Sequence, residues 1–392
     1  FRSTWPGFAG KRKQLEELNK EKATIEKQAV ITMIAAVEPE ARANHILMRG
    51  EYDKPGDAVE TSAPGSIMEF SAELPKNRLG LARWIIDPNN PLTARVAVNR
   101  YWQMIFGAGI VVTSEDFGTQ GDRPSHQALL DSLAVEFVES GWDVKHLIRM
   151  MVTSASYQQS SAQSSLILEN DPNNLLLSHA PRQRLAAESV RDHVLAVSGL
   201  LVEKRGGPGV QPYQPAALFG INAIGSSNAS YKQGSGDAFY RRSLYTYWKR
   251  QIPADNMRIL GADGRVSCRT RRELTNTPLQ ALVVLNDPQF VEAARALGTR
   301  AMKEGGESIE SRIAYAFRLS TSRAANASEL AILVAEFKDR LGEFEKDLPR
   351  AKAYLAGGGA LKADPDLDPA QLAAYAAVAS LILNLDESIS KS

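Results

Sequence analysis

Apolar residues recur at the spacing of an α-helix along most of this chain. Pro124 opens a stretch whose apolar residues between 129 and 138 fall on one stripe, and Gly141 ends it. Asp143 is placed to cap the helix that follows. The same signals predict a mainly α fold, a multi-helix bundle-like domain. Further helices are predicted over residues 11–28, 91–106, 182–201, 277–286, 288–302, 308–319, 328–348 and 369–384.

A small β component is expected beside these helices. The apolar runs 30–34 and 45–48 suit strands, and the polar stretch between them is typical of a loop. Residues 240–250 are rich in aromatic and β-branched residues, with Leu244, Thr246 and Trp248 on one face. We therefore expect a small β component near the N-terminus and a short strand pair near 240–250.

Glycine and proline divide the chain. The segment 50–65 is rich in both and predicts a linker, so we place the main boundary near residue 66. Residues 1–65 are then an N-terminal helix, a small β segment and a linker, the tail of an upstream domain. Residues 66–392 form the mainly helical domain. It contains a long loop over 206–237, where such length indicates function or disorder, and a flexible surface loop is expected over 355–368.

Composition excludes several classes of protein. The chain has 46 Lys and Arg against 45 Asp and Glu, a net charge of +1, so no basic excess favours nucleic acid. No apolar run is long enough for a membrane span. A single cysteine, Cys268, excludes an internal disulfide, a Cys-x-x-Cys-His haem attachment site and a multi-cysteine zinc site. The chain starts at Phe1 rather than Met, which suggests a processed chain, a fragment, or a start inside a longer polypeptide.

Three polar or aromatic residues, Asn99, Arg100 and Trp102, lie near the end of one predicted helix. They are candidate ligand-binding residues, because Arg is a natural partner for a carboxylate and Trp offers a face on which a sugar can stack. The structural alternative is that Arg100 bonds to helix C-terminal carbonyls while Trp102 belongs to the core.

Asp116, His126 and His146 are the candidate catalytic residues. Both histidines fall in the first turn of a predicted helix, where they are able to act as acid or base near neutral pH or bind a haem. The alternative is a local hydrogen bond. No His-x-x-x-His or His-Glu-x-x-His spacing occurs, so no metal site is predicted.

Arg49 and Asp53 belong to a dense polar loop, RGEYDKPG, at the end of a predicted strand. A rigidly held loop of this kind is a candidate for ligand binding. The alternative is a tie between domains, in which the two side chains pair with the helical region.

Several segments, in their order and spacing, resemble a known family. From about Arg49 to its end, the chain is similar to the planctomycete-specific C-terminal domain of unknown function in exported proteins that carry a cytochrome c domain (the PSD family). One departure is LGADGRVSCRTRRE at 260–273, where relatives carry an Asp-Ala-Pro-like turn. The segments are RGEYDKPGD at 49–57, NPLTARVAVNRYWQMIFGAGIV at 90–111, DFGTQGDRPSHQALLDSLAVEFVESGW at 116–142, KHLIRMMVTSASYQQSS at 145–161, RLAAESVRDHVLAVSGLL at 184–201, GGPGV at 206–210, RRSLYTYWKRQIP at 241–253, TNTPLQALVVLNDPQFVEAARAL at 275–297 and LILNLDES at 381–388.

The resemblance implies a setting. Relatives look like exported proteins, which implies a periplasmic or cell-surface location although the chain shows no signal peptide. A c-type haem is then expected on an upstream domain or a partner subunit, with no cofactor held by this chain. The partners so implied are a cytochrome c domain or subunit and a polysaccharide.

Three functions follow as hypotheses. The first is an accessory or scaffold module of an exported haem-containing assembly, with its reaction unknown. The second is a haem-coupled enzyme acting on complex carbohydrate, which requires the candidate side chains to meet in one pocket. The third is a structural subunit that forms a homo-oligomer through the helix 11–28 and the acidic C-terminal region.

Overall fold

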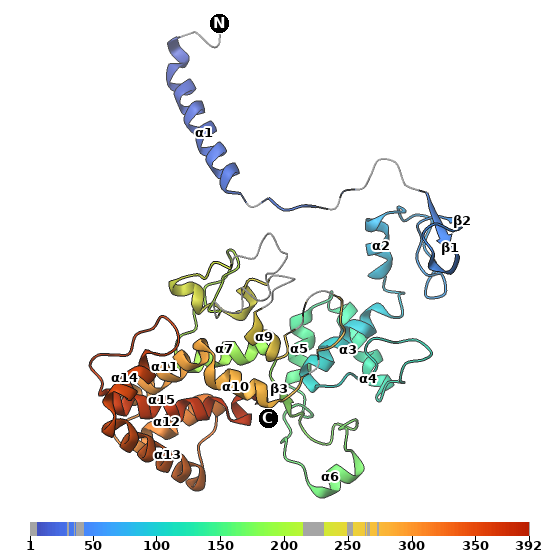
Figure 1. Cartoon of the computed structure of the whole chain (residues 1–392). Helices are drawn as coiled ribbons and strands as arrows, with labels where there is room; N and C mark the ends of the chain where they lie inside the picture. Colours follow the sequence, from blue (N-terminus) through green and yellow to red (C-terminus); the bar gives the residue numbers. More distant parts are fainter. Residues whose placement is uncertain are drawn as a thin grey trace. The chain divides into compact units, whose positions relative to one another are not determined.

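The computed structural model describes residues 6–29, 31–34, 36, 43–214, 231–248, 254–262, 264, 267–272 and 274–391 (Figure 1). Two compact units share the chain, Phe1–Trp84 and Ile85–Ser392. Each unit is described by itself below.

The first unit contains a long helix and a β-hairpin. Helix α1 (Ala9–Gln28) confirms the helix predicted over 11–28, and none of its residues is buried. Strand β1 (Asn44–Leu47) pairs antiparallel with β2 (Pro55–Val59). The short 3₁₀ turn η2 (Met48–Gly50) follows β1, and α2 (Arg78–Ile85) closes the unit.

Two predictions are wrong in this unit. The described residues 31–34 form no strand, and the segment predicted as a linker contains β2. The reason is pairing, because a strand needs a partner for its backbone N–H and C=O groups. The backbone of β1 finds that partner in β2, across the turn at Arg49 and Gly50, both at positive φ.

The second unit is built almost entirely of helices, which confirms a mainly α fold. In addition, two-residue strands β3 (Gln183–Arg184) and β4 (Ser390–Lys391) pair antiparallel. The helices are α3 (Thr93–Phe106), α4 (Gln127–Glu139), α5 (Val144–Val152), α6 (Ser165–Asn170), α7 (Ala187–Ser198), α9 (Asp255–Ile259), α10 (Pro278–Asn286), α11 (Pro288–Glu304), α12 (Ile309–Thr321), α13 (Ala327–Lys346), α14 (Leu348–Ala356), α15 (Pro369–Leu383) and α16 (Asp386–Ile389).

Capping side chains at the helix starts explain why the sequence predicts where these helices begin. The Asp143 carboxylate accepts the backbone N–H groups of Lys145 and His146 at the start of α5, as predicted. Thr277 and Gln280 form a reciprocal capping box at the start of α10. Proline occupies the first turn of α10, α11, α14 and α15, where its missing N–H removes no helical hydrogen bond.

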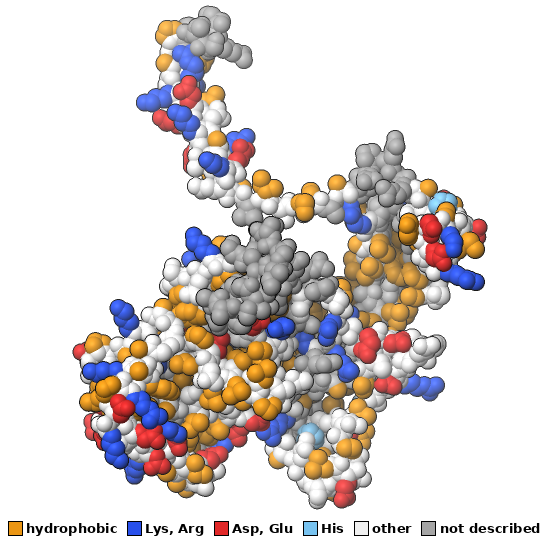
Figure 2. Space-filling model, in the orientation of Figure 1, with side chains coloured by type: hydrophobic (Ala, Val, Ile, Leu, Met, Phe, Trp, Pro, Cys, Tyr) orange, Lys and Arg blue, Asp and Glu red, His pale blue; other side chains and the backbone are white. Residues whose placement is uncertain are grey.

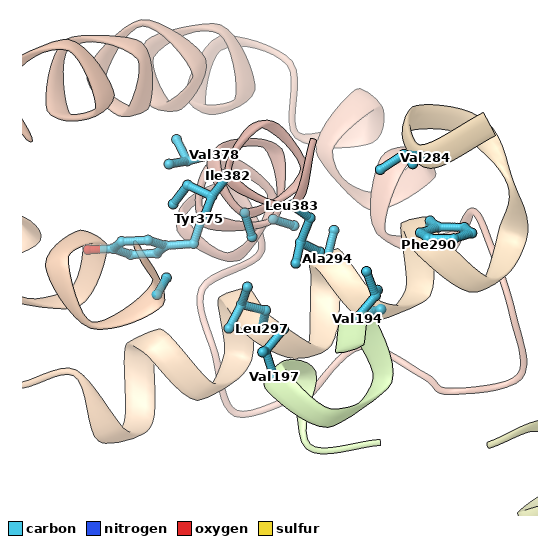
Figure 3. Packing of buried hydrophobic residues seen from close by; sticks show 14 of the residues in the cluster. Val194, Val197, Val284, Phe290, Ala294, Leu297, Tyr375, Val378, Ile382 and Leu383 are labelled. Atoms are coloured by element: carbon cyan, nitrogen blue, oxygen red, sulfur yellow. The ribbon is translucent and has the colours of Figure 1, made fainter. Parts of the chain in front are cut away.

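Helix α15 is the centre of the main core. Its sequence, PAQLAAYAAVASLIL, is apolar on every side, which is typical of a helix surrounded by protein. Side chains from α7, α10 and α11 point toward it (Figure 3). Gly298 of α11 allows a close crossing, since a Cβ there would lie 2.9 Å from the backbone nitrogen of Ala376. Most of α15 is therefore interior, and association through the C-terminal region stays a prediction.

A second, smaller core joins α3, α4 and α5. It includes Val98, Trp102, Leu130, Phe137 and Leu147, all buried. The predicted stripes on these helices are the faces that meet here, and Gly107 and Gly141 end α3 and α4 at positive φ.

The strand pair expected near 240–250 is not present in the described residues up to Trp248. Two isolated bridges, Val202 with Arg241 and Val210 with Thr246, stand in its place, next to the 3₁₀ turn η4 (Ser243–Tyr245). The physical reason is competition for the backbone, because side chains of α7 bind the main-chain groups that a strand ladder would use. Residues 249–250 lie outside the described residues.

One further boundary differs from its prediction. The helix expected over 182–201 begins only at Ala187, because Gln183 and Arg184 pair with β4.

Among the described residues, no helix is long and apolar enough to cross a membrane.

Candidate functional site

Buried charged side chains gather where α7 and α11 face residues 204–214 and 231–248. Charged groups are rarely buried unless they are paired, so this gathering requires an explanation. We call this group the buried polar cluster; it comprises Arg191, Tyr213, Tyr240, Arg241, Gln289, Glu292 and Arg295.

Arg191 of α7 is 2% exposed and its guanidinium joins α11 to the segment before η4. It donates to Gln289 Oε1 at 2.5 Å, to the carbonyls of Phe239 at 2.7 Å and Arg241 at 2.8 Å, and to Ser243 Oγ at 3.1 Å. One buried cation on α7 therefore satisfies acceptors from two other segments, 239–243 and the start of α11, that are far apart in the sequence.

Burial governs the ionisation of this arginine. Loss of water lowers the pKa of Arg191 to about 10, and the nearby carboxylates of Asp192 and Asp287 act in the opposite direction. The guanidinium therefore remains charged at neutral pH. Asp192 also accepts the N–H of Ser243 at 2.7 Å. Arg191 and Asp192, which are adjacent on α7, therefore both bind the chain at residues 241–243.

Glu292 of α11 is completely buried, and one of its oxygens accepts three hydrogen bonds. Oε1 receives the hydroxyls of Tyr240 at 2.9 Å and Tyr213 at 3.2 Å, and the N–H of Leu361 at 2.5 Å. Oε2 is buried with no hydrogen-bond partner among the described residues. Burial, with the adjacent carboxylate adding to it, raises the pKa of both tyrosines, so both remain protonated donors.

Arg295 lies one turn further along α11 and binds the other side of the same loop. Its guanidinium donates to the carbonyls of Gly357 at 2.8 Å and Gly358 at 3.2 Å, and also to those of Leu355 and Leu361. Burial lowers its pKa, and the charge of Glu292 raises it in part. The loop expected to be flexible is thus held by the Glu292 carboxylate at the N–H of Leu361 and by the Arg295 guanidinium at its carbonyls.

Glycine is required where this loop passes over Glu292. Gly358 and Gly359 both have positive φ, at 69° and 63°. A Cβ on Gly359 would lie 2.1–2.4 Å from the carboxylate atoms of Glu292, far inside van der Waals contact. Hydrogen bonds thus join α11 to Tyr213, to Tyr240 and to the loop after α14, and Glu292 Oε2 keeps unused acceptor capacity.

Of the candidate ligand-binding residues near the end of α3, two are buried and one is exposed. Asn99 is completely buried, and its amide pairs with both the N–H and the carbonyl of Val111, at 2.9 and 3.0 Å. Trp102 is buried and stacks on Phe106, with ring centroids 4.0 Å apart. Arg100 is exposed. The first two are therefore occupied in the small core, and a ligand-binding role for the three remains a prediction.

Each of the candidate catalytic residues has a partner in its own neighbourhood. Asp116 Oδ1 accepts the N–H of Gly118 at 2.7 Å, and His126 Nδ1 lies 3.1 Å from Ser125 Oγ. His146 Nε2 lies 2.7 Å from Glu136 Oε1, a pair that is about 40% exposed on each side. No hydrogen bond or ion pair among the described residues joins two of the three candidates.

The remaining histidines differ in their contacts. His45 Nδ1 lies 3.0 Å from the Gly56 carbonyl, and His179 Nδ1 lies 2.7 Å from the Ala180 carbonyl. His193 Nε2 is buried with no hydrogen-bond partner among the described residues. Within the described part of the chain, no group of three or more His, Cys, Asp or Glu side chains is arranged to hold a metal ion.

Arg49 and Asp53 lie in the β1–β2 turn of the first unit, and both are exposed. Arg49 has a φ of 56°, which few side-chain-bearing residues adopt. A ligand-binding role for this loop stays a prediction.

The sequence reasoning missed the buried polar cluster. A detectable signal was present in α11, where Gln289, Glu292 and Arg295 follow at intervals of three within an otherwise apolar run. Such a stripe of polar groups on one helical face indicates buried pairing when the flanking residues are alanine, leucine and phenylalanine. The tyrosines had no comparable signal, because Tyr213 and Tyr240 meet Glu292 only through the fold.

Hollows in the second unit lie outside the cluster. One hollow of about 390 Å³ has a mostly polar lining that includes Lys391. The ammonium group of Lys391 already has partners, because Nζ donates to the Ile105 carbonyl at 3.1 Å and lies 4.0 Å from the centre of the Tyr157 ring. A second, of about 470 Å³, is lined by Leu285, Leu381 and neighbours. A third, of about 660 Å³, lies between α14 and the start of α15.

The fold and the cluster define a mainly helical domain whose distant segments are joined by buried charged side chains. Its family follows from comparison of sequences: residues 77–337 match the family described as "PSD1: Protein of unknown function (DUF1553)". The chain belongs to this family, which confirms the resemblance drawn from its segments. Comparison with curated proteins and with solved structures gives no match.

Proposed function

We propose that this chain is a scaffold module of an exported haem-containing assembly, and that it docks a c-type cytochrome domain through the exposed face of α10. The observation that carries the proposal is the apolar character of that face. Leu279 and Leu282 are each 54% exposed, on a helix whose sequence, PLQALVVLN, has no charged residue. A contiguous apolar surface on a folded domain favours a site of protein association.

The apolar surface continues beyond α10. Leu285, in the last turn of α10, lines the 470 Å³ hollow together with Leu381 of α15 and Phe344 of α13. Hydrophobic side chains are visible at the surface of this part of the second unit (Figure 2). Paired charges surround the hollow, with Arg340 bonded to Glu336 at 2.7 Å. An apolar centre with a polar rim is the usual anatomy of a protein interface.

A non-enzymatic role is also supported by the candidate catalytic residues. An acid–base pair needs side chains that converge on one substrate position. Asp116, His126 and His146 are each engaged locally, and the buried polar cluster uses its charges on its own backbone. We therefore place the chemistry of the assembly on the haem-bearing partner, and the polysaccharide, if bound, outside this cluster.

The test compares two pairs of exposed leucines. The double variant Leu279→Glu/Leu282→Glu places two charges on the α10 face, and Leu166→Glu/Leu168→Glu does the same on α6, where the leucines are 67% and 50% exposed. Immobilised wild type and both variants are exposed to the exported fraction of the source cells, and bound covalent haem is measured by absorbance after washing.

We expect the α10 variant to lose the bound haem signal and the α6 variant to retain it, with the helical circular dichroism of all three unchanged. Equal haem capture by both variants would remove α10 as the docking face. Absence of haem from the wild-type sample, together with a native polypeptide that carries no covalent haem, would overturn the scaffold proposal.

A further inference from the structure

The 660 Å³ hollow lies between the end of α14 and the start of α15, in the connection visible in Figure 1. Its volume is within the range typical of small-molecule sites, roughly 300–1,000 Å³. Leu355 and Leu372, which are 4% and 0% exposed, form its floor, while Leu361 and Leu367 lie in its wall. The lining is therefore mainly apolar, with aliphatic side chains and no aromatic face on which a sugar would stack.

Two ammonium groups border this apolar surface. Lys352 and Lys362 both line the hollow, and neither has an ion-pair partner among the described residues. The carboxylate that also lines it, Asp364, is already engaged, because it pairs with Lys303 and accepts the N–H of Asp366 at 3.0 Å. The hollow thus combines an aliphatic interior with an unneutralised positive border.

The wall of the hollow is fixed in advance by the buried polar cluster. Tyr213 accepts the N–H of Ala360 at 2.6 Å and Glu292 accepts that of Leu361, while Arg295 binds carbonyls on both sides. A loop that is already held in place loses little conformational entropy when a ligand binds. This gives the two buried charges of α11 a role as positioning residues for the loop that encloses the hollow.

We propose that this hollow binds a small amphipathic carboxylate, with its aliphatic body against Leu355 and Leu372 and its carboxylate at Lys352 and Lys362. The site is separate from the α10 face and does not depend on the scaffold proposal. It requires no bond to form or break: the ligand enters by transfer of apolar surface from water and is oriented by charge.

The probe is decanoate, a straight-chain carboxylate, measured by isothermal titration calorimetry against the complete chain. Decan-1-ol supplies the same tail without the charge. We expect decanoate to bind at one site per chain and about tenfold more tightly than decan-1-ol, the ratio that corresponds to 1.4 kcal/mol of charge interaction. Equal affinity for the two probes would contradict a role for the lysines.

Matched variants separate the hollow from the rest of the surface. Lys352→Glu/Lys362→Glu reverses the border charge and is expected to lower decanoate affinity at least about tenfold. Lys338→Glu, which changes an exposed lysine of α13 outside the hollow, is expected to leave it within about twofold. Ala356→Trp places a ring into the hollow and should abolish binding of both probes.

Two results would overturn the assignment. One is decanoate binding that survives Ala356→Trp, since the ligand would then bind elsewhere. The other is the absence of decanoate binding while the chain cosediments with vesicles of phosphatidylglycerol, because the surface would then recognise an anionic bilayer rather than a free carboxylate. Circular dichroism of each variant confirms that a lost signal does not come from unfolding.

Discussion

The small core of α3–α5 and the buried polar cluster of α7 and α11 differ in how deeply their ionisable side chains are buried. Around α3–α5, His146 and Glu136 lie 2.7 Å apart on consecutive helices and remain partly exposed. In the cluster, Arg191 and Glu292 are nearly or completely buried, and each joins segments from distant parts of the chain. Exposed pairs contribute little to stability, whereas removing one partner of a buried pair is costly. The comparison indicates that the stability of the second unit depends on a few interior charges.

The largest expected effect follows from removing the central cation. Arg191→Met leaves the acceptors of Phe239, Arg241 and Gln289 buried without donors, so we expect a loss of about 3–5 kcal/mol in the free energy of unfolding. Urea denaturation followed by circular dichroism measures it. Arg100→Ala, an exposed arginine of α3, should change stability by less than about 0.5 kcal/mol. Similar losses in both variants would contradict the contrast between the two regions.

The next effect concerns the glycine over Glu292. Gly359→Ala introduces a Cβ within 2.4 Å of the carboxylate at a φ of 63°, and we expect a loss of about 2–3 kcal/mol. Gly342→Ala is the matched control, because that glycine lies inside α13 with open space around it. Alanine there should stabilise the chain by roughly 0.5–1 kcal/mol. Thermal unfolding of the two variants should therefore shift in opposite directions, and a neutral Gly359→Ala would mean that the loop is not tightly held.

A smaller effect is expected from one hydroxyl of the cluster. Tyr240→Phe removes one of the three hydrogen bonds to Glu292 Oε1 and should cost about 1 kcal/mol, since two donors remain. A double-mutant cycle with Glu292→Gln isolates the pair. If the two changes are additive within about 0.3–0.5 kcal/mol, the tyrosine and the carboxylate are not coupled and the cluster is less cooperative than the geometry indicates.

The smallest effect is a pH dependence of stability. Burial lowers the pKa of His193 below its ordinary value of about 6.5, and the bond to the Ser320 backbone acts in the opposite direction. The unfolded chain therefore binds the proton first as the pH falls below about 6.5, so this residue makes the folded chain less stable from there down to its folded pKa. The slope from one proton is at most about 1.4 kcal/mol per pH unit.

The variant that tests this dependence is His193→Gln. We expect the fall in stability between pH 7 and pH 5 to be shallower in His193→Gln than in the wild type, as measured by urea denaturation at each pH. His126→Gln, which replaces a half-buried histidine elsewhere in the second unit, is measured alongside as the matched variant. An unchanged profile in His193→Gln would show that other groups set the acid sensitivity.

Local sequence signals were sufficient for most helices of the second unit. Asp143, Thr277 and Asp287 cap helices where the sequence places them, and Gly107 and Gly141 end them, because capping and termination act through residues a few positions apart. The family was also evident from the order of segments. Helix caps and helix ends depend on residues a few positions apart, so the sequence is sufficient to predict them.

Tertiary structure decided the rest. Residues 240–248 have the composition of a strand, but Arg191 and Asp192 take their backbone groups, so only isolated bridges form. Tyr213, Tyr240 and Leu361 reach Glu292 from up to 79 positions away, and no local pattern encodes that meeting. The sequence by itself determined where helices begin and end, since those choices depend on neighbouring residues. Which polar groups became interior was determined only when the helices packed, because burial and pairing depend on residues brought together from across the chain.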